Sequence, residues 1–396
     1  MALDMATTQA EALSDISRQR LDLLATVAGV RDDLMAGGPL AEKAGTLPQL
    51  SIDALSRSRA FYLKLPQCLG GLEADLVTQM QVIEALSYIE PSAAWCAAVG
   101  ATGIGEIGAF VSDAAVKEIF AHRIPIAGYT ITPTGEAKKI KAGYMLNGRW
   151  AFASGIRHAH WVLAGALVTS DNGTPPVKRC FVFPATSISI VDNWDVAGLK
   201  GTGSCDYTVS DLFVPEEFTW TPGDAPRRGG ALYRLERPAI VAHEHAAFAI
   251  GVAQRALDEL LLLAQSKRRG MQASTLAMRP VFQRMAAENL LKLKSVRSLA
   301  HELFGEAWSK ISRDEPPTGT EQAAMRAAAT FATQTAVECC SVAFRFGGGT
   351  ALQSKSPLQK CLRDINAAAQ HIIVNDISYE NYGQFLLGIP GANAMA

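Results

Sequence analysis

The chain has almost no net charge, because its acidic and basic residues are nearly equal in number. Its 396 residues include 37 Lys and Arg and 38 Asp and Glu, which leaves a formal net charge of −1. Proteins that bind nucleic acid or anionic membranes through electrostatics carry an excess of positive charge. We therefore expect no nucleic-acid partner and no membrane partner.

The sequence also lacks the segments that direct a chain into or across a membrane. We find no apolar run of the roughly 18–20 residues that would cross a bilayer. Residues 1–15 include acidic side chains but no Lys or Arg, so they lack the basic region of a secretory signal. Both absences predict a cytoplasmic protein.

Cysteine is sparse and unpaired in the sequence. The seven cysteines are scattered, and none forms a Cys-x-x-Cys pair. Cys339 and Cys340 are adjacent on a predicted helix, where a bridge between neighbours would be strained. We expect all seven to be reduced packing residues, as is usual in the cytoplasm.

What the chain does have is a clear change of hydrophobic period along its length. Residues 1–122 carry apolar side chains at three- and four-residue spacing, which predicts helices. In residues 123–226 the period is two, and turns rich in Gly, Pro, Asn and Asp separate short apolar runs, as in an antiparallel sheet or barrel. Residues 227–396 contain four long amphipathic segments, the last covering residues 358–387. We predict a helical domain, a central antiparallel β domain and a C-terminal four-helix bundle.

The most informative stretch is residues 143–161, in the β-patterned third. Trp150 and Phe152 alternate along it and lead into the small polar pair Ser154 and Gly155. Such a strand can present aromatic walls and one hydroxyl to a flat ligand. Aromatic residues on strands more often pack in a core, so a functional interpretation depends on the other motifs.

Four motifs together resemble the acyl-CoA dehydrogenase family. Residues 143–161 resemble its flavin-facing strand, and residues 130–137 (TITPTGEA) resemble a loop that approaches flavin and substrate. Residues 194–215 match the pattern W-x-x-x-G-L-x-G-T-G-S-x-D, and residues 341–371 match the C-terminal helix signature. The chain is most similar to the two-component (group D) flavin-dependent monooxygenases of this fold, which include aromatic and indole-type hydroxylases and dibenzothiophene monooxygenase-like enzymes. The resemblance implies an α+β, mostly α, fold.

The resemblance implies a flavin site made from several loops. The 130–135 loop and the 201–204 loop would hold the isoalloxazine and phosphate, and Ser154 would contact N5. The GTGS sequence alone is more typical of an ordinary tight turn, but its place in the family's order favours flavin binding. The implied cofactor-binding residues are Thr130, Thr132, Pro133, Gly135, Trp150, Phe152, Ser154, Gly201, Thr202, Gly203, Ser204, Gly347, Gly348 and Arg363, the last three toward the flavin of a neighbouring subunit.

His371 and Ser154 are the implied catalytic residues. His371 stands where the dehydrogenases of this fold carry the acid that removes a substrate proton. An imidazole titrates near neutrality and can accept a proton from a substrate O–H or N–H. Trp95 and His243, together with His371, are the candidate substrate-binding residues.

Two histidine pairs have the spacing of weak metal candidates. His158 and His160 could share one face of a strand, but no third ligand is in view. His243 and His245 would point in different directions on a helix, and one of them could line a pocket. We expect no metal site.

The resemblance implies an oxygenase that inserts one atom of O2 into an aromatic or heteroaromatic substrate, phenol- or indole-like. The implied oxidant is a C4a-hydroperoxide of reduced FMN or FAD, held in an apolar pocket that excludes water. No G-x-G-x-x-G follows a predicted strand, so we expect a separate NAD(P)H-dependent flavin reductase to supply FMNH2 or FADH2. The family also implies a homo-oligomer, a dimer of dimers.

Three other functions stay open on the sequence. An acyl-CoA dehydrogenase-type FAD oxidoreductase would share the fold but needs a carboxylate where His371 stands. An N-oxygenase of an amine or amino sugar would use the same flavin chemistry on a different nucleophile. A catalytically inactive scaffold of the same fold would not need to bind flavin.

Overall fold

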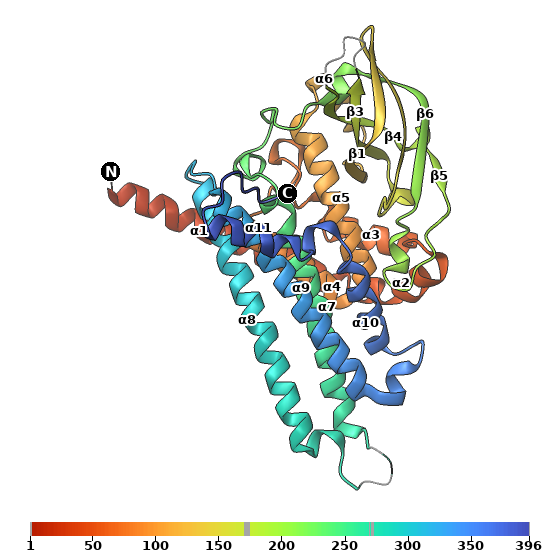
Figure 1. The fold of residues 1–396 in the computed structure, drawn as a ribbon, viewed down its shortest axis with the longest axis vertical. Helices are drawn as coiled ribbons and strands as arrows, with labels where there is room; N and C mark the ends of the chain where they lie inside the picture. The colour runs from red at the N-terminus through yellow and green to blue at the C-terminus, as the bar shows by residue number, and fades with distance from the viewer. Residues whose placement is uncertain (1, 170–174, 269, 271–272, 396) are drawn as a thin grey trace.

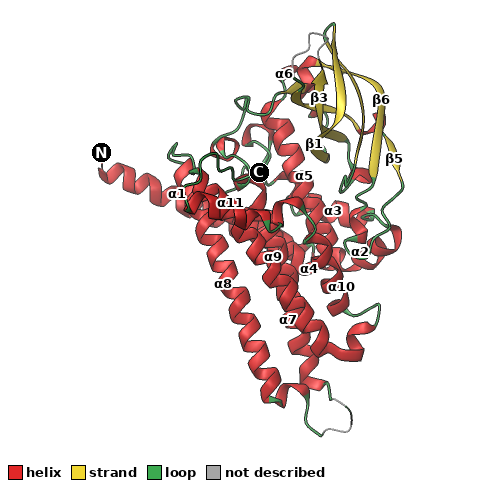
Figure 2. Cartoon of the chain, viewed as in Figure 1, coloured by secondary structure: helices red, strands yellow, loops and turns green. Residues whose placement is uncertain are grey.

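The sheet lies at one end of the molecule and helices form the rest (Figures 1 and 2). The computed structural model describes residues 2–169, 175–268, 270 and 273–395, with residues 2–14 described only as helical backbone. This arrangement confirms the mostly helical α+β fold predicted from the change of hydrophobic period. All seven cysteines are free thiols.

Six helices precede the sheet. Two of them begin with a side-chain cap of the usual kind: the Asp75 side chain accepts from the Thr78 N–H, and Ser112 accepts from the Ala115 N–H. They are α1 (Ala2–Gly29), α2 (Arg31–Ala44), α3 (Gln49–Arg57), α4 (Leu76–Ile89), α5 (Pro91–Phe110) and α6 (Asp113–Ile119).

Helix α5 corrects one expectation from the sequence. By length and composition it could cross a membrane. A scan of the sequence for apolar runs does not detect it, because many of its residues are Gly and Ala. Within the protein, 78% of its most apolar segment is buried, as in the core helix of a globular fold. Its small side chains let neighbours approach closely: a Cβ on Gly105 would lie 2.9 Å from Cβ of Lys64.

Seven strands form one sheet in the order β5-β6-β2-β1-β3-β4-β7. They are β1 (Ala127–Ile140), β2 (Gly143–Trp150), β3 (Trp161–Thr169), β4 (Val177–Pro184), β5 (Ser189–Val191), β6 (Asp206–Pro215) and β7 (Thr219–Trp220). The expectation of a purely antiparallel sheet was wrong at one pair, because β1 and β3 run parallel. The β1–β2 hairpin is followed by a longer connection that returns the chain to the other side of β1. The β1–β3 register shifts between Thr130 and Gly135, so the TITPTG segment bulges from the ladder.

The C-terminal part contains α7 (Ala239–Ser266), α8 (Pro280–Ile311), α9 (Gly319–Gly347), α10 (Pro357–Ala368) and α11 (Ile377–Leu386). The fourth segment, expected as one helix over residues 358–387, is broken into α10, a short 3₁₀ turn at Ile372–Val374, and α11. The three residues of that turn are β-branched, and Asn375 and Asp376 follow, all weak helix formers. The break places His371 at the start of the turn rather than on a helix.

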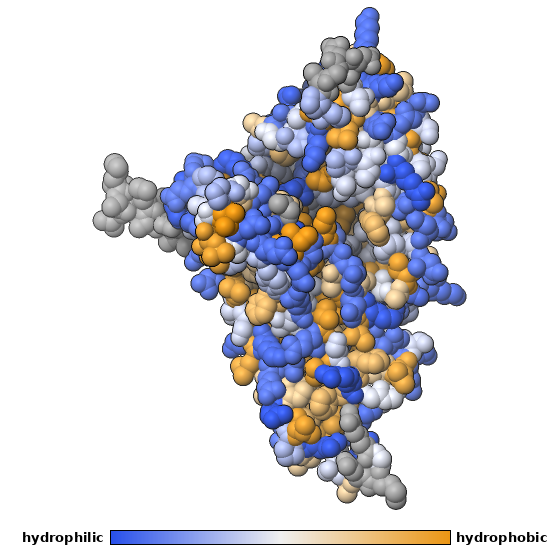
Figure 3. All heavy atoms as spheres, viewed as in Figure 1, coloured by the Kyte–Doolittle hydropathy of each residue, from blue (hydrophilic) through white to orange (hydrophobic). Residues whose placement is uncertain are grey.

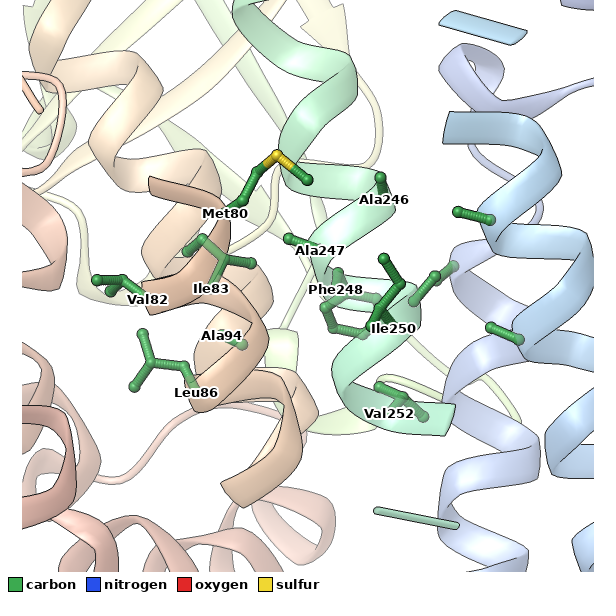
Figure 4. Close-up of a cluster of buried hydrophobic side chains, with 14 of the residues drawn as sticks. Met80, Val82, Ile83, Leu86, Ala94, Ala246, Ala247, Phe248, Ile250 and Val252 are labelled. Atoms are coloured by element: carbon green, nitrogen blue, oxygen red, sulfur yellow. The ribbon is translucent and has the colours of Figure 1, made fainter. Parts of the chain in front are cut away.

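Two apolar cores hold the molecule together, and α5 borders both. One core joins the N-terminal helices to the C-terminal bundle, and the other fills the sheet and packs on α5 and α6. Figure 4 shows Met80 and Ile83 of α4 on the side of α7 that carries Ala247. The divisions at residues 122 and 226 therefore describe changes in sequence pattern, because the two helical parts share one core.

The side chain of Trp150 lies inside the sheet domain. It is 1% exposed, its ring stacks on Tyr207 at 5.2 Å between centroids, and its Nε1 donates to the Gly165 carbonyl at 2.8 Å. A Cβ on Gly135 would lie 2.2 Å from Cζ2 of this indole. The expectation that Trp150 forms a wall of the ligand site is therefore wrong. Gly135 is glycine because the indole occupies the space beside it.

Gly135→Ala tests this packing. The added methyl group would meet a fully buried ring that cannot move aside, so we expect the free energy of unfolding to fall by about 1–3 kcal/mol. Chemical denaturation monitored by tryptophan fluorescence measures the change. Gly305→Ala on α8 is the control, because its new Cβ would be 3.5 Å from its nearest neighbour and should be neutral or slightly stabilising. Equal stability of the Gly135 variant and the parent protein would contradict the packing argument.

Candidate active site

A tight turn after β2 brings Ser154 to the boundary between the sheet and the helices. Phe152 has φ 58° and Gly155 has φ 73°, and these two left-handed residues reverse the chain. The Ala153 N–H donates to the Cys205 carbonyl at 3.2 Å, and the Gly155 N–H donates to the Thr202 carbonyl at 2.9 Å. The turn is thereby fastened to the 202–205 loop. The Phe152 side chain is 73% exposed.

Three hydroxyls and one indole form a continuous hydrogen-bonded chain at this turn. Nε1 of Trp95, on α5, donates to Oγ of Ser154 at 3.0 Å. Ser154 Oγ lies 2.7 Å from Ser204 Oγ, which lies 2.7 Å from Thr202 Oγ1. The Thr202 hydroxyl donates to the Leu199 carbonyl at 2.8 Å. All three hydroxyl residues are buried, so the chain is shielded from water.

The 201–204 loop contributes two buried hydroxyls, and two of its backbone N–H groups are occupied within the turn. The Thr202 and Gly203 N–H groups donate to carbonyls within their own turn. A Cβ on Gly201 would lie 2.7 Å from the Ala41 Cβ, so this glycine permits close packing on α2. The N–H groups of Thr202 and Gly203 are therefore occupied, and phosphate binding by this loop stays a prediction. The side chains of Thr202 and Ser204 remain near the candidate site.

Trp95 is also the centre of a cluster of rings from the C-terminal helices. Its ring centroid lies 5.3 Å from His245 and 5.1 Å from Phe248, both on α7. His371 lies 5.8 Å from Trp95 and 4.2 Å from His245. The His371 Nδ1 accepts the Ile373 N–H at 3.3 Å and so caps the short turn that follows. Two imidazoles and one serine hydroxyl therefore meet around one indole.

His243, predicted from the sequence to bind substrate, lies inside the core. Its side chain is fully buried, its Nε2 is 2.9 Å from the Gln79 Oε1, and its Nδ1 is 3.1 Å from the Ala239 carbonyl. Both ring nitrogens are thus occupied, and His245 is the histidine of α7 that reaches the ring cluster. Successive helix positions rotate by about 100°, so residues two apart face different ways. The motif alone does not say which one faces the site.

Both histidines of the cluster are neutral at neutral pH. Burial lowers the pKa of His371 to about 4. Burial, and then the neighbouring His371, hold the pKa of His245 well below its usual range. Because Nδ1 of His371 accepts a backbone N–H, its single proton resides on Nε2. His371 therefore offers an N–H, whereas His245 makes no hydrogen bond to the described residues and keeps one ring nitrogen as an acceptor.

A carboxylate that sequence reasoning missed lies next to His245. The Glu244 side chain is buried on α7 and pairs with Lys64, whose Nζ lies 3.0 Å from Oε2. Lys64 also donates to Thr102 and to the Ile240 carbonyl, each at 2.7 Å. Burial raises the pKa of Glu244, and the lysine opposes that shift. With this carboxylate committed to an ion pair, Glu244 is a poor candidate for the proton-abstracting acid of a dehydrogenase.

The acids downstream of His371 are no better placed for that role. Asp376 is exposed, and its Oδ1 accepts from the Gln334 side chain at 2.8 Å. Glu380 is exposed on α11. His371, by contrast, lies 5.8 Å from Trp95 between ring centroids.

The bulge in β1 divides the TITPTG loop between core and surface. Thr130 is buried, with its Oγ1 2.5 Å from the Tyr207 hydroxyl. Thr132 is exposed and Pro133 is half-buried. Among the predicted flavin-binding residues of this loop, Thr132 and Pro133 are therefore accessible, while Thr130 and Gly135 support the sheet.

Arg363 links three segments of its own chain. It donates to the Ala197 carbonyl at 2.7 Å, to Glu42 at 2.8 Å and to Gln359 at 2.7 Å. These contacts fasten α10 to α2 and to the loop before the hydroxyl chain, and they occupy the guanidinium. Its predicted role toward a neighbouring subunit's flavin therefore finds no support within this chain.

Gly347 and Gly348 end α9 near Lys267, at the end of the bundle away from the sheet (Figure 1). Gly348 has φ 53°, which explains a glycine at this position. Neither glycine approaches the Trp95 cluster in the same chain. A role for this turn in flavin binding requires a second subunit and stays a prediction.

His158 and His160 are not on a strand. His158 ends a 3₁₀ turn (Ile156–His158), and the Nδ1 of His160 accepts the Ile126 N–H at 2.9 Å. They line a cavity of about 650 Å³ beside α3, together with Arg123 and Arg157. No group of three or more metal-ligating side chains occurs among the residues that the structure describes. This cavity is separate from the Trp95 cluster.

The residues around Trp95 fit a flat ring with a polar edge. Phe152, two residues before Ser154 in the sequence, is 73% exposed, and Ile372, which follows His371, is 72% exposed. A ligand bound beside them would cover these two apolar side chains. Figure 3 shows hydrophobic residues in several patches over this face, including the middle of the molecule. A flavin ring, apolar on its faces and polar along its edge, matches this combination.

Comparisons with known proteins agree with this geometry. Residues 244–376 match the family model described as acyl-CoA dehydrogenase, C-terminal domain. An indole-3-acetate monooxygenase of Pseudomonas putida is 28% identical over 93% of this chain and 94% of its own length. The oxygenase component of an FADH(2)-dependent resorcinol hydroxylase from Rhizobium sp. is 26% identical, over 94% and 96%.

The solved structure of XiaF from Streptomyces sp., in complex with FADH2 and glycerol, matches with a TM-score of 0.87. Its sequence identity is 22%, over 96% of this chain and 98% of XiaF, so this match supports the fold alone. The motif order, the site geometry and the full-length relatives lead to the same conclusion. Over nearly its whole length the chain is similar to flavin-dependent monooxygenases, and its C-terminal part matches the acyl-CoA dehydrogenase family model.

Proposed function

We propose that this protein is the oxygenase component of a two-component system, and that it hydroxylates a small phenol- or indole-like substrate with reduced flavin and O2. The observation that carries the proposal is the convergence on Trp95 of a serine hydroxyl from the sheet and two neutral imidazoles from the C-terminal helices. Relatives named for indole-3-acetate and resorcinol support an aromatic substrate. The seven free thiols agree with a reducing cytoplasm.

The residues that would hold the flavin are three accessible side chains and the buried hydroxyl of Ser154. Phe152 offers an aromatic face, Thr132 and Pro133 lie on the accessible part of the β1 bulge, and Ser154 offers its hydroxyl oxygen. When bound, reduced flavin supplies the two electrons that activate O2, from which one oxygen atom passes to the substrate. FMN and FAD share the isoalloxazine that these residues would contact.

The imidazole pair positions and deprotonates the substrate. Nε2–H of His371 donates a hydrogen bond to the substrate's oxygen or nitrogen, because its Nδ1 is occupied by the Ile373 N–H. The imidazole of His245 lies beside that of His371, and its unpaired ring nitrogen accepts the substrate proton. Removing that proton makes the ring a stronger nucleophile. The assignment of the base thus moves from His371, as expected from the sequence, to its neighbour.

Trp95 and Phe248 exclude water from the reacting groups. Their rings meet edge to face at 5.1 Å and cover the α7 side of the cluster. A site with few polar groups keeps the activated oxygen from being lost to hydrogen peroxide. Coupling of oxygen use to product should therefore depend on this apolar wall.

His371→Ala and His245→Ala separate the two roles. We expect either variant to keep flavin binding and to lose hydroxylation by about 10²–10⁴-fold, the usual contribution of a positioned acid or base. Turnover should be measured on a series of fluorinated phenols of falling pKa. An ionised phenol needs no base, so the defect of His245→Ala should shrink along the series while that of His371→Ala persists.

The same series supplies the contradicting outcome. A defect of His371→Ala that shrinks while that of His245→Ala persists would assign the proton transfer to His371. The Ser87→Ala variant, which removes a buried hydroxyl that donates only to the Ile83 carbonyl, is the control for folding and expression.

The pH dependence of stability tests the neutral state of His371. Its pKa is about 4 in the folded protein and near 6.5 when unfolded. As pH falls from 6.5 to 4, the unfolded chain binds a proton that the folded chain does not, so stability is lost in this window. His371→Asn should reduce the slope of unfolding free energy against pH by up to about 1.4 kcal/mol per pH unit. Urea titrations between pH 4.5 and 7 measure it, and parallel curves would contradict a buried neutral imidazole.

Dependence on a separate reductase is tested with the purified protein. We expect no product from NADH, oxidised flavin and substrate alone, and turnover once a flavin reductase is added. Chemically reduced flavin, mixed with the protein and then exposed to oxygen, should give a single turnover without any reductase. Steady product formation from NADH without a reductase would refute the two-component assignment.

A further inference from the structure

The hydroxyl chain at Ser154 has a fixed direction, because neither of its ends can be reversed. One end is the indole Nε1–H of Trp95, which only donates, and the other is the carbonyl of Leu199, which only accepts. Thr202 must therefore give its proton to that carbonyl. Ser204 must then give its proton to Thr202, and Ser154 must give its proton to Ser204.

This direction determines what Ser154 can still offer to a ligand. A hydroxyl has one proton and two lone pairs. The proton of Ser154 is committed to Ser204, and one lone pair receives the Trp95 N–H. Only an acceptor lone pair remains, so Ser154 accepts one further hydrogen bond and donates none.

The chain is buried and anchored, so its direction is stable. Ser154, Ser204 and Thr202 are each at most 6% exposed, which leaves little access for water to supply another partner. The Leu199 carbonyl also receives the Trp194 Nε1–H at 3.2 Å. The Leu199 N–H is held by Asp364 of α10 at 2.7 Å. The C-terminal helix thereby fixes the acceptor that terminates the chain.

The two redox states of flavin differ at the atom that this hydroxyl would meet. N5 of oxidised flavin carries a lone pair and needs a donor, whereas N5 of reduced flavin carries a hydrogen and needs an acceptor. We propose that the one-way chain from Trp95 through Ser154, Ser204 and Thr202 to Leu199 selects reduced over oxidised flavin at N5. This inference rests on the proposed function and assigns Ser204 and Thr202 as positioning residues that act through Ser154.

Such selection suits an oxygenase that depends on a diffusing cofactor. A separate reductase leaves reduced and oxidised flavin together in solution, and both share the same ring and phosphate. A site that binds by stacking and shape alone would fill with either form. An acceptor-only hydroxyl penalises the oxidised form, whose N5 and the serine oxygen would face each other as two acceptors. Oxidised flavin would also leave readily after turnover.

Ser204→Ala and Thr202→Val test the proposal by freeing the Ser154 proton. Without the Ser204 hydroxyl, the proton of Ser154 has no internal acceptor and can turn to an oxidised N5. Without the Thr202 hydroxyl, Ser204 can donate to Ser154 instead, with the same result. Dissociation constants for oxidised and dithionite-reduced FMN and FAD are measured anaerobically. We expect the ratio of the oxidised to the reduced constant to fall about tenfold in both variants, the effect of one mismatched hydrogen bond.

Two control variants make the result specific. Trp95→Phe removes a donor but leaves the carbonyl end intact, so Ser154 still gives its proton to Ser204 and the ratio should stay as in the parent protein. Ser87→Ala, whose hydroxyl donates to the Ile83 carbonyl on α4, should also leave it unchanged. Thermal unfolding of each variant verifies that it is folded.

The possible outcomes separate this inference from the proposed function. If both flavin forms bind and the ratio is unchanged in Ser204→Ala and Thr202→Val, the selection mechanism is wrong while the enzyme assignment stands. An equal fall of the ratio in Trp95→Phe would also overturn it, because packing rather than proton direction would then set the preference. Failure of the parent protein to bind any reduced flavin would refute the proposed function itself.

Discussion

The arrangement of this protein depends on the indole of Trp95 and its hydrogen bond to Ser154. Trp95 lies on α5, the helix that borders both apolar cores, and its Nε1–H donates a hydrogen bond to a hydroxyl of the sheet domain. The same ring contacts His245 and His371 from the C-terminal helices. A change at this indole would therefore remove the donor at the start of the hydroxyl chain and alter the position of both imidazoles.

Buried charges keep the surrounding helices in place. Lys64 and Glu244 tie the segment before α4 to α7, and Lys360 bridges Glu90 and Asp364 between α4 and α10. A buried ion left without its partner is strongly destabilising, so these pairs tolerate few alternative packings. Asp364 also holds the Leu199 N–H, which connects the ion-pair network to the hydroxyl chain. The polar interior thus fixes one arrangement of helices around an otherwise apolar site.

Hydrophobic period predicted most of the fold, because it reports directly which faces of helices and strands are buried. The hydrophobic period did not predict features of the fold that depend on contacts between distant segments. The parallel pairing of β1 with β3 follows from the path of the connection after β2, which no local pattern records. The break of the last long segment at Ile372–Val374 has a local cause in β-branched residues, yet similar residues elsewhere remain helical when packing favours it.

For the site, the sequence by itself determined the order of the motifs and which reactive side chains are present. These include an imidazole in place of an acid at position 371 and a serine after an aromatic strand. The tertiary structure alone decided which groups meet. It turned His243 into the core and His245 toward Trp95, and it buried Trp150 while exposing Phe152. The reason is physical, because the sequence specifies only side-chain types and their spacing. The direction of a side chain is set by the residues that pack around it. The direction of a shared proton is set by the donor or acceptor at the far end of the series of hydrogen-bonded hydroxyls.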